Sequence, residues 1–391
     1  MGRRSMREKA KKSTPKIRRM YKYRLYHTGR RNRRLHEQID IAGLIWNHGV
    51  ALQRRCYRLT GKYIPASKLK SHLAHLRREI PAFAYWQLLN SQTVQDIVER
   101  LDNAYQRFFA GKGGLPNFKK IKKYRSITLK QAGWKLLGGN KIRIGKRIYK
   151  FVNHRELRGE IKTVTIKRDT LGRLWLCFSV VEKLLPPAEA SAGKIGGFDF
   201  GLKTFLTDDE GGPHWSPQFF ARSLRTIAKC NRALSRKQKG SRNRKRAQRA
   251  LDRAHDRVAN QRRNDHFRLA HELCDQYDVM ILEDLNLAGM KRLWGRKVSD
   301  LGFGQFTQIL GYVAAKRGKR VEYIDRFTPT SQTCSQCGHR QVMPLRERTF
   351  HCEECGFVID RDHNAARNIL RVGMSTLDLE VVRPSAEGSL A

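Results

Sequence analysis

Four cysteines in the C-terminal part of the chain have the spacing of a metal site. They form two Cys-x-x-Cys pairs separated by 14 residues, namely Cys334, Cys337, Cys352 and Cys355. Each pair brings two thiolates within reach of one ion, and two pairs complete a tetrahedral four-sulfur site for zinc. Gly338 and Gly356 each follow a second cysteine, where a knuckle turn needs a positive φ. Because such a site has no open coordination position, we expect the zinc to be structural.

Disulfide bonds are the alternative use of these thiols. No secretory signal is evident in the sequence, and the other four cysteines occur singly, at Cys56, Cys177, Cys230 and Cys274. This pattern is typical of unpaired thiols in a reducing compartment, so the sequence favours zinc.

Three acidic residues lie where predicted strands end or a helix begins. Asp199 lies in the strand GGFDFG, Glu283 ends the apolar strand VMILE, and Asp362 opens a short helix behind the cysteines. Hydrolysis of a phosphodiester by two Mg²⁺ ions needs converging carboxylates, since one ion activates water and the other stabilises the leaving oxygen. Mg²⁺ prefers such oxygen ligands. These three acids are therefore the candidate catalytic and magnesium-binding residues.

Each acid also has a purely structural explanation. Asp199 could be a turn residue. Beside Glu283, Asp284 is the better candidate for capping the next helix. Of Asp360 and Asp362, one could be a helix cap or could pair with a neighbouring arginine. The spacing alone does not decide among these alternatives.

The chain is strongly basic, with 80 Lys and Arg against 35 Asp and Glu and a formal net charge of +45. Self-repulsion of this size is costly unless a polyanion neutralises it, so we expect a long nucleic acid as partner. An anionic membrane surface is the weaker alternative, because no strong amphipathic anchor accompanies the charge. No run of 18 apolar residues is present that could span a membrane.

The charge is densest in a predicted basic helical arm, residues 223–275, which is broken near 239–241. Between Arg236 and Arg263 this arm carries twelve Lys and Arg but only two acids. We expect its first part to bind nucleic acid, through Arg236, Lys237, Lys239, Arg242, Arg244, Lys245 and Arg246.

The first half of the chain reads as helices inserted into a small β-barrel. The alternating segment 21–26 predicts a first strand, and helical periodicity dominates from about 34 to 109. After a glycine-rich break at 111–118, short strands are predicted at 126–129, 141–144, 149–152, 161–167 and 174–182. The proline-containing segment 184–193 is the best predicted domain linker.

The second half predicts an α/β domain. A strand at 194–200 has a hairpin partner at 204–207, and further strands at 279–282 and 320–325 surround a helix near 306–316.

From about residue 194 to 370 the chain closely resembles the TnpB family, RNA-guided nucleases encoded by insertion sequences. The RuvC-like core of that family also occurs in compact type V CRISPR effectors. The matching motifs are FDFGLKTFLTDDEG (198–211), NQRRNDHFRLAHEL (260–273), ILEDLNLAGM (281–290), FGQFTQILGYVAAKRGKRV (303–321), DRFTPTSQTCSQCG (325–338) and CEECGFVIDRDHNAARNIL (352–370). The N-terminal half matches less tightly.

The resemblance implies an α/β fold: a RuvC-like (RNase H-like) nuclease domain with an inserted zinc ribbon, preceded by a β-barrel wedge domain that carries an inserted helical recognition domain. The implied organisation is a disordered basic arm (1–19), a first wedge strand (20–30), the recognition domain (31–112), the wedge domain (113–190), the nuclease domain (191–330), the zinc ribbon (331–358), a last RuvC-like segment (359–371) and a disordered tail (372–391).

The resemblance also assigns roles. Asp199, Glu283 and Asp362 correspond to the RuvC-like acids that hold Mg²⁺, and Asp362 is preferred to Asp360 because the family motif places its acid just before x-N-A-A. Arg348 corresponds to a basic position that could contact the scissile phosphate. The implied partners are a guide RNA and a target DNA, with base pairing supplying the sequence specificity.

Three alternatives stay open at this point: a compact type V CRISPR effector, a DNA-transposing enzyme, and a regulator that binds nucleic acid without cutting it. We expect a prokaryotic cytoplasmic protein associated with the nucleoid. The sequence does not reveal the guide RNA, the target-adjacent motif or the oligomeric state.

Overall fold

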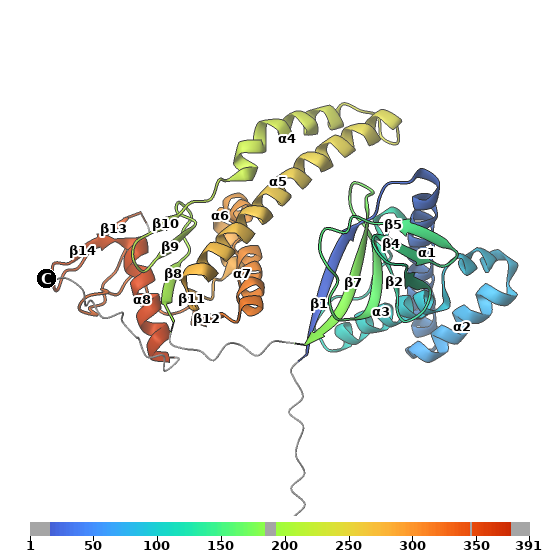
Figure 1. Ribbon diagram of the computed structural model, residues 1–391, viewed down its shortest axis with the longest axis horizontal. Coiled ribbons are helices and arrows are strands. Elements are labelled where there is room, and N and C mark those ends of the chain that lie inside the picture. The colour runs from blue at the N-terminus through green and yellow to red at the C-terminus, as the bar shows by residue number, and fades with distance from the viewer. Residues whose placement is uncertain (1–15, 184–192, 345, 377–391) are drawn as a thin grey trace, which may run out of the picture. The chain divides into compact units, whose positions relative to one another are not determined.

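The structure is a computed structural model that describes residues 16–183, 193–344 and 346–376. The chain divides into two compact units, Met1–Leu185 and Pro186–Ala391 (Figure 1), and each is considered by itself. Most of the predicted basic N-terminal segment (1–19), of the predicted linker (184–193) and of the predicted C-terminal tail (372–391) lies outside the described residues. No helix among the described residues is long and apolar enough to cross a membrane.

The helices of the first unit follow directly on its first strand. The elements are β1 (Lys16–Arg24), α1 (Gly29–Thr60), α2 (Ala66–Glu79), the 3-10 helix η1 (Pro81–Leu88) and α3 (Ser91–Phe109). The helical periodicity predicted for residues 34–109 is confirmed in α3, where Val94, Ile97, Val98 and Leu101 form a buried apolar stripe. Asn90 caps this helix by accepting a hydrogen bond from the backbone N–H of Gln92 at 2.9 Å.

The strands of this unit form two antiparallel sheets, and the small β-barrel that the sequence indicated stays a prediction. The remaining elements are η2 (Ile121–Lys123), β2 (Ser126–Leu129), β3 (Trp134–Leu136), β4 (Lys141–Ile144), β5 (Arg147–Lys150), β6 (Glu160–Arg168) and β7 (Leu174–Lys183). One sheet has the order β1-β7-β6-β2 and the other β3-β4-β5, and a single bridge between Leu25 and Phe151 lies between them. The sequence did not predict β3, whose three residues are too few to show alternation.

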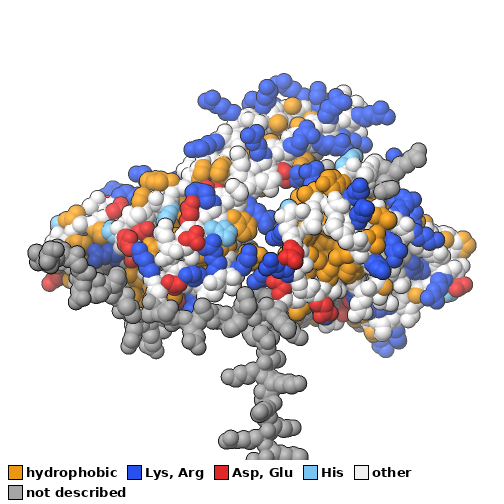
Figure 2. All heavy atoms as spheres, in the orientation of Figure 1, with side chains coloured by type: hydrophobic (Ala, Val, Ile, Leu, Met, Phe, Trp, Pro, Cys, Tyr) orange, Lys and Arg blue, Asp and Glu red, His pale blue; other side chains and the backbone are white. Residues whose placement is uncertain are grey.

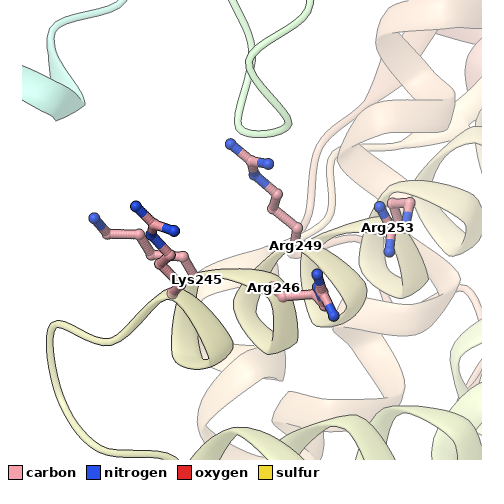
Figure 3. A pocket seen from close by; sticks show the side chains of 5 residues that line it. Lys245, Arg246, Arg249 and Arg253 are labelled. Carbon is pink, nitrogen blue, oxygen red and sulfur yellow. The ribbon is translucent and has the colours of Figure 1, made fainter.

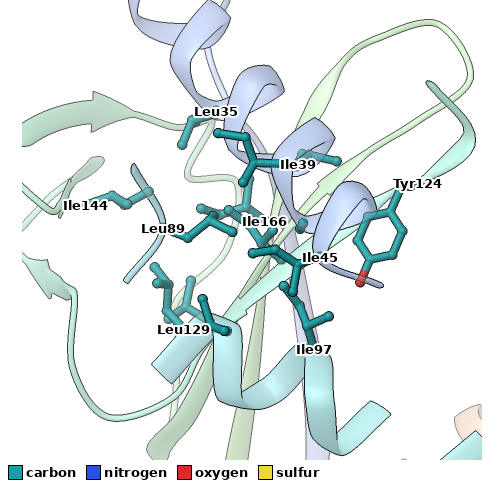
Figure 4. Close-up of a cluster of buried hydrophobic side chains, with 14 of the residues drawn as sticks. Leu35, Ile39, Ile45, Leu89, Ile97, Tyr124, Leu129, Ile144 and Ile166 are labelled. Carbon is teal, nitrogen blue, oxygen red and sulfur yellow. The ribbon is translucent and has the colours of Figure 1, made fainter. Parts of the chain in front are cut away.

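One core joins the helices of this unit to its sheets (Figure 4). Leu35 and Ile39 of α1, Ile97 of α3 and Ile166 of β6 belong to the same buried cluster, and Ile144 of β4 extends it to the smaller sheet. The helices between β1 and β2 are therefore packed against the sheets of the same unit.

The second unit is built on a five-stranded mixed sheet. Its elements are β8 (Ile195–Asp199), β9 (Leu206–Asp208), β10 (Pro213–His214), α4 (Phe219–Ser235), α5 (Arg242–Gln276), β11 (Val279–Glu283), α6 (Leu287–Leu301), α7 (Phe303–Arg317), β12 (Arg320–Ile324), β13 (Thr349–His351), β14 (Val358–Asp360) and α8 (Arg361–Thr376). The strand order is β10-β9-β8-β11-β12. The strands β8, β11 and β12 are parallel, and β9 and β10 add antiparallel strands beyond β8.

Helices cover both faces of this sheet, so every residue of β11 except the last is buried. Met280 and Leu282 join a core with α5 and α7, whereas Ile281 packs with Ile369 of α8 on the opposite face. The strand therefore reads as an unbroken apolar run and not as an alternating one.

Glycine in β8 lets α8 approach the sheet closely. A Cβ on Gly197 would lie 2.5 Å from the carbonyl oxygen of Ala366 and 2.6 Å from the backbone nitrogen of Leu370. Both atoms belong to the α8 backbone and cannot swing aside, so the register of α8 on the sheet depends on this glycine.

The predicted basic arm is a helical hairpin of α4 and α5, broken where the sequence predicted the break. Ile227 of α4 packs with Leu251 and Val258 of α5 in a small core of its own. Ser241 caps α5 by accepting a hydrogen bond from the backbone N–H of Arg244 at 3.1 Å. The base of α5 packs on α7 within the main core of the unit, so the arm is anchored to the sheet domain.

Replacing Gly197 by alanine should destabilise the second unit by about 1–3 kcal/mol, because the new methyl group overpacks a rigid contact with α8. Urea unfolding at equilibrium measures this change. The control is Gly311→Ala in α7, where a Cβ meets nothing within 4 Å and alanine should stabilise the helix by roughly 0.5–1 kcal/mol. If Gly197→Ala unfolds at the same urea concentration as the wild type, α8 does not approach β8 this closely.

Candidate active site

The structure brings the three candidate acids to one edge of the sheet in the second unit. Asp199 ends β8 and Glu283 ends β11, and the register pairs Phe198 with Leu282 in these parallel strands, so the two acids occupy adjacent positions. Asp362 lies in the first turn of α8. Its Oδ2 is 3.2 Å from the place that a Cβ on Gly201 would take, just beyond the end of β8.

The carboxylates influence one another electrostatically. Burial, with the negative charges of Asp362 and Glu283, raises the pKa of Asp199 to about 8, and the positive charge of Arg361 opposes this shift. Burial, followed by the charge of Asp284, raises the pKa of Glu283. A cation bound between the carboxylates would relieve this repulsion, so the donor set suits a hard divalent ion such as Mg²⁺.

Two arginines lie next to Asp362, which is 9% exposed. Arg361 Nη2 is 3.2 Å from Asp362 Oδ1, and Arg348 Nη1 is 3.7 Å from Asp362 Oδ2. Arg348 therefore lies beside the carboxylates, and a phosphate approaching them would meet its guanidinium.

The neighbouring acids have structural roles. Asp360 caps α8, because its Oδ1 accepts hydrogen bonds from the backbone N–H groups of Asp362 at 2.9 Å and His363 at 3.1 Å. The prediction that Asp284 caps the next helix is wrong. Asn286 caps α6 instead, by accepting from the backbone N–H of Gly289 at 3.0 Å, and Asp284 pairs with Arg326. The cap lies two residues later because three residues without regular secondary structure, 284–286, separate β11 from α6.

The four predicted zinc ligands gather at one point. Their sulfur atoms all lie within 4.8 Å of one another, with Cys334 Sγ 3.8 Å from Cys355 Sγ and Cys337 Sγ 3.6 Å from Cys352 Sγ. A tetrahedral ion about 2.3 Å from each sulfur requires separations of about 3.8 Å, so the sulfurs fit zinc. Among the described residues no other set of three or more His, Cys, Asp or Glu side chains is as closely gathered, the three carboxylates included.

The zinc knuckles have the turns that the sequence predicted. Gly338 and Gly356 both adopt positive φ, at 81° and 70°, and each donates its backbone N–H to the carbonyl of the first cysteine of its pair at 3.0 Å. The buried sulfurs pack with Met343 and Phe350 in a core separate from that of the sheet. These features make the site a small structural domain of its own.

Two buried asparagines, which sequence reasoning missed, tie α8 to the first knuckle. Asn364 accepts a hydrogen bond from the backbone N–H of Ser335 at 2.9 Å and donates to the carbonyl of Thr333 at 2.8 Å. Asn368, one turn later, donates to the carbonyls of Thr330 at 2.8 Å and Thr333 at 2.6 Å. We call Asn364 and Asn368 the asparagine clamp. Their i, i+4 spacing on the helix that bears Asp362 was the available signal.

The residues predicted to bind nucleic acid lie on the basic hairpin, where Lys and Arg side chains cover the exposed surface (Figure 2). Five side chains of α5 line a shallow hollow (Figure 3): Arg242, Lys245, Arg246, Arg249 and Arg253. Arg249 and Arg253 were not predicted, although they continue the spacing of three or four residues along one helix face. Arg244 turns inward, since its Nη1 donates to the carbonyls of Leu234 and Lys237 at 2.9 Å each, so it closes the hairpin.

Two family models match the chain. The model described as "Cas12f1-like, TNB domain" matches residues 303–369, and the one described as "Probable transposase" matches residues 177–293. A "Putative RNA-guided DNA endonuclease" of Streptomyces pristinaespiralis is 29% identical over 95% of this chain and 94% of its own length. The "Putative RNA-guided DNA endonuclease InsQ" of Escherichia coli is 26% identical over 91% of this chain and 92% of its own length.

Solved structures share the fold. A Cas12f1 chain in a complex with single guide RNA and target DNA aligns over 90% of this chain and 98% of its own, with a TM-score of 0.57 at 14% identity. The mini-RNA-guided endonuclease CRISPR-Cas_phi3 aligns over 91% of this chain and 92% of its own, with a TM-score of 0.54 at 11% identity. The predicted mixed α/β fold is confirmed at this level.

Without Mg²⁺, the stability of the protein should depend on pH through Asp199. Its folded pKa of about 8 lies above the unfolded value of about 3.9, so the folded state holds a proton that the unfolded chain releases, and stability falls as pH rises through this window. The Asp199→Asn variant cannot ionise. It should match the wild type near pH 4 and be more stable by roughly 1–3 kcal/mol at pH 8.5. Urea unfolding at both pH values measures the stability difference between Asp199→Asn and the wild type. A stability difference of the same size at pH 4 and pH 8.5 would contradict the raised pKa.

Breaking the asparagine clamp should loosen the first turns of α8. In Asn368→Asp a carboxylate would face the carbonyls of Thr330 and Thr333, and losing a buried donor in this way costs about 1–3 kcal/mol. We expect faster amide hydrogen exchange in α8 with zinc still bound, and a similar increase when a chelator removes zinc from the wild type. Ser375→Ala, an exposed position on the same helix, is the control. Unchanged exchange in both cases would mean that the knuckle does not hold α8.

Proposed function

The chain belongs to the TnpB family, and from this we propose that it is an RNA-guided DNA endonuclease that hydrolyses phosphodiester bonds at a RuvC-like site. The observation that carries the proposal is the convergence of Asp199, Glu283 and Asp362 at one sheet edge, where burial, together with the negative charges of Asp362 and Glu283, raises the pKa of Asp199. Repulsion of this kind is typical of carboxylates that share divalent cations.

Asp199, Glu283 and Asp362 would hold two Mg²⁺ ions. When bound, the ions supply an activated water and stabilise the leaving oxygen of the phosphodiester. The protein's own part is to fix the carboxylates: β8 and β11 are adjacent parallel strands, and α8 is fixed by its contact with Gly197. Arg348, half-exposed beside Asp362, would orient a non-bridging phosphate oxygen as it approaches. A zinc ion held by the four cysteines would do no chemistry, because four thiolates would leave it no open position.

The basic hairpin would hold the nucleic-acid backbone. The exposed cations of α5 lie on one face, as binding to a phosphate chain without base recognition requires. A guide RNA that pairs with the target DNA would supply the sequence specificity that these contacts lack. The first unit would act as the wedge and recognition regions. A defined RNA that copurifies with the full chain supports the guided function, and its absence would contradict it.

Removing any one of the three carboxylates should abolish metal-dependent cleavage. Losing an outer-shell partner already costs 10–100-fold in metal affinity or activity, so Asp199→Ala, Glu283→Ala and Asp362→Ala should each lower the cleavage rate by at least about a hundredfold. The assay uses the full chain with its copurified RNA on a matching DNA target. Glu322→Gln, an acid of the same sheet that pairs with Arg320, should cut at the wild-type rate. Cleavage that survives Asp199→Ala would exclude this mechanism.

A further inference from the structure

A cavity of about 600 Å³ opens beside Glu283 in the second unit. It lies where β11, β12, α6 and α7 meet, and Glu283, Asp284 and Asp325 provide its acidic lining. Its apolar lining includes Leu287, Phe303 and Tyr323. We call this space the Glu283 cavity. Its volume is in the range of sites that enclose small organic groups.

The apolar wall of the Glu283 cavity is held in place by packing. Phe303 is 1% exposed and belongs to the main core. A Cβ on Gly304 would come within 2.9 Å of Leu287 Cδ1, so Leu287 rests directly on the first turn of α7. Tyr323 on β12 is 48% exposed and offers an aromatic surface. These side chains form a surface suited to a flat, uncharged ring.

The charge of the Glu283 cavity is opposite to that of the chain as a whole. No Lys or Arg lines it, in a protein with a net charge of +45. Arg326, which is outside the lining, pairs with Asp284, and Asp325 accepts a hydrogen bond from the backbone N–H of Phe327 at 2.8 Å. A phosphate would be repelled by these carboxylates, so a nucleotide could place only its neutral part inside.

We propose that the Glu283 cavity receives the nucleobase of a nucleotide adjacent to the phosphodiester held at the three acids. Because Glu283 belongs to both places, a strand whose phosphate lies at the carboxylates has a neighbouring base within reach of the cavity. The apolar wall and Tyr323 stack against that base, as aromatic side chains do in single-strand binding sites. The inference rests on the proposed nuclease function and adds a determinant of substrate choice to it.

The acidic lining also predicts which bases are preferred. Carboxylates accept hydrogen bonds, and the exocyclic amino groups of cytosine and adenine donate them. Asp284 and Asp325 would therefore favour an amino-bearing base over thymine, which presents a carbonyl oxygen at the corresponding position. Sequence preference at the cut would then come from the protein itself, separately from the pairing of guide and target.

The test is an abasic scan of a short single-stranded DNA, bound to the full chain with its copurified RNA in Ca²⁺ so that the strand is not cut. In the wild type, removing the base at one position should weaken binding by roughly five- to fiftyfold, whereas removal elsewhere should matter little. In Leu287→Trp the indole fills the cavity, so binding should be weak with or without that base. Leu293→Trp lies on the same helix but is 73% exposed and outside the lining, and it should behave as the wild type.

A second variant guards against misfolding. Gly304→Ala suits a helix and acts only by pushing Leu287 toward the cavity, so it should reduce the base-dependent loss without changing zinc content. The proposal is overturned if no single base removal weakens binding to the wild type more than the others do. It is also overturned if Leu287→Trp still loses affinity when that one base is removed.

Cleavage of the intact strands in Mg²⁺ separates this inference from the proposed function. If one base position affects binding strongly but the protein never cuts DNA, the nucleobase site is supported and the nuclease function is contradicted. A chain that cuts normally without a distinct position would retain the nuclease function and lose the base site. Replacing the base at the distinct position by thymine should reproduce part of the abasic loss; tighter binding of thymine than of cytosine would contradict the role of the carboxylates.

Discussion

The meeting of like charges at one sheet edge is the constraint on which the second unit depends. Three carboxylates within electrostatic reach of one another, partly shielded from water, oppose the compact state unless a proton or a cation intervenes. Burial, followed by the negative charges of Asp362 and Glu283, raises the pKa of Asp199 and so disfavours its charged form. The site can exist only because the elements that carry the acids cannot move apart, so the surrounding structure has to be rigid and held from more than one side.

Rigidity at this edge has three independent sources. The acids of β8 and β11 are fixed by the register of two parallel strands with helices on both faces. The third acid is on α8, which lies against backbone at Gly197 and against the zinc knuckle through Asn364 and Asn368. A zinc ion held by the four cysteines would thus be connected, through two amide side chains, to the helix that carries Asp362.

The sequence predicted the elements of the molecule better than the contacts between them. Strands β2 and β4 and the cysteine knuckles were predictable because alternation, turn glycines and ligand spacing are local signals. The short strand β3, the two separate sheets and the cap at Asn286 were not, because they depend on which segments meet in space. The three acids could be chosen only by family resemblance, since each had an equally good structural explanation taken alone. The asparagine clamp left only the i, i+4 spacing of its two residues as a local signal, and the Glu283 cavity left none.

The distribution of charge suggests how one molecule can combine tight binding with selective chemistry. The exposed cations of α5 can contact any phosphate chain, and they carry no information about its bases. At Asp199, Glu283 and Asp362 the charged groups are acidic, so a strand held by its phosphates elsewhere would approach them only if these carboxylates held cations. No Lys or Arg lines the Glu283 cavity, so its carboxylates would repel a phosphate and would admit an uncharged ring. A nucleic acid passing from the basic surface to the acids would therefore meet requirements of increasing stringency: first a phosphate backbone, then metal-bridged geometry, and finally the chemical identity of one base.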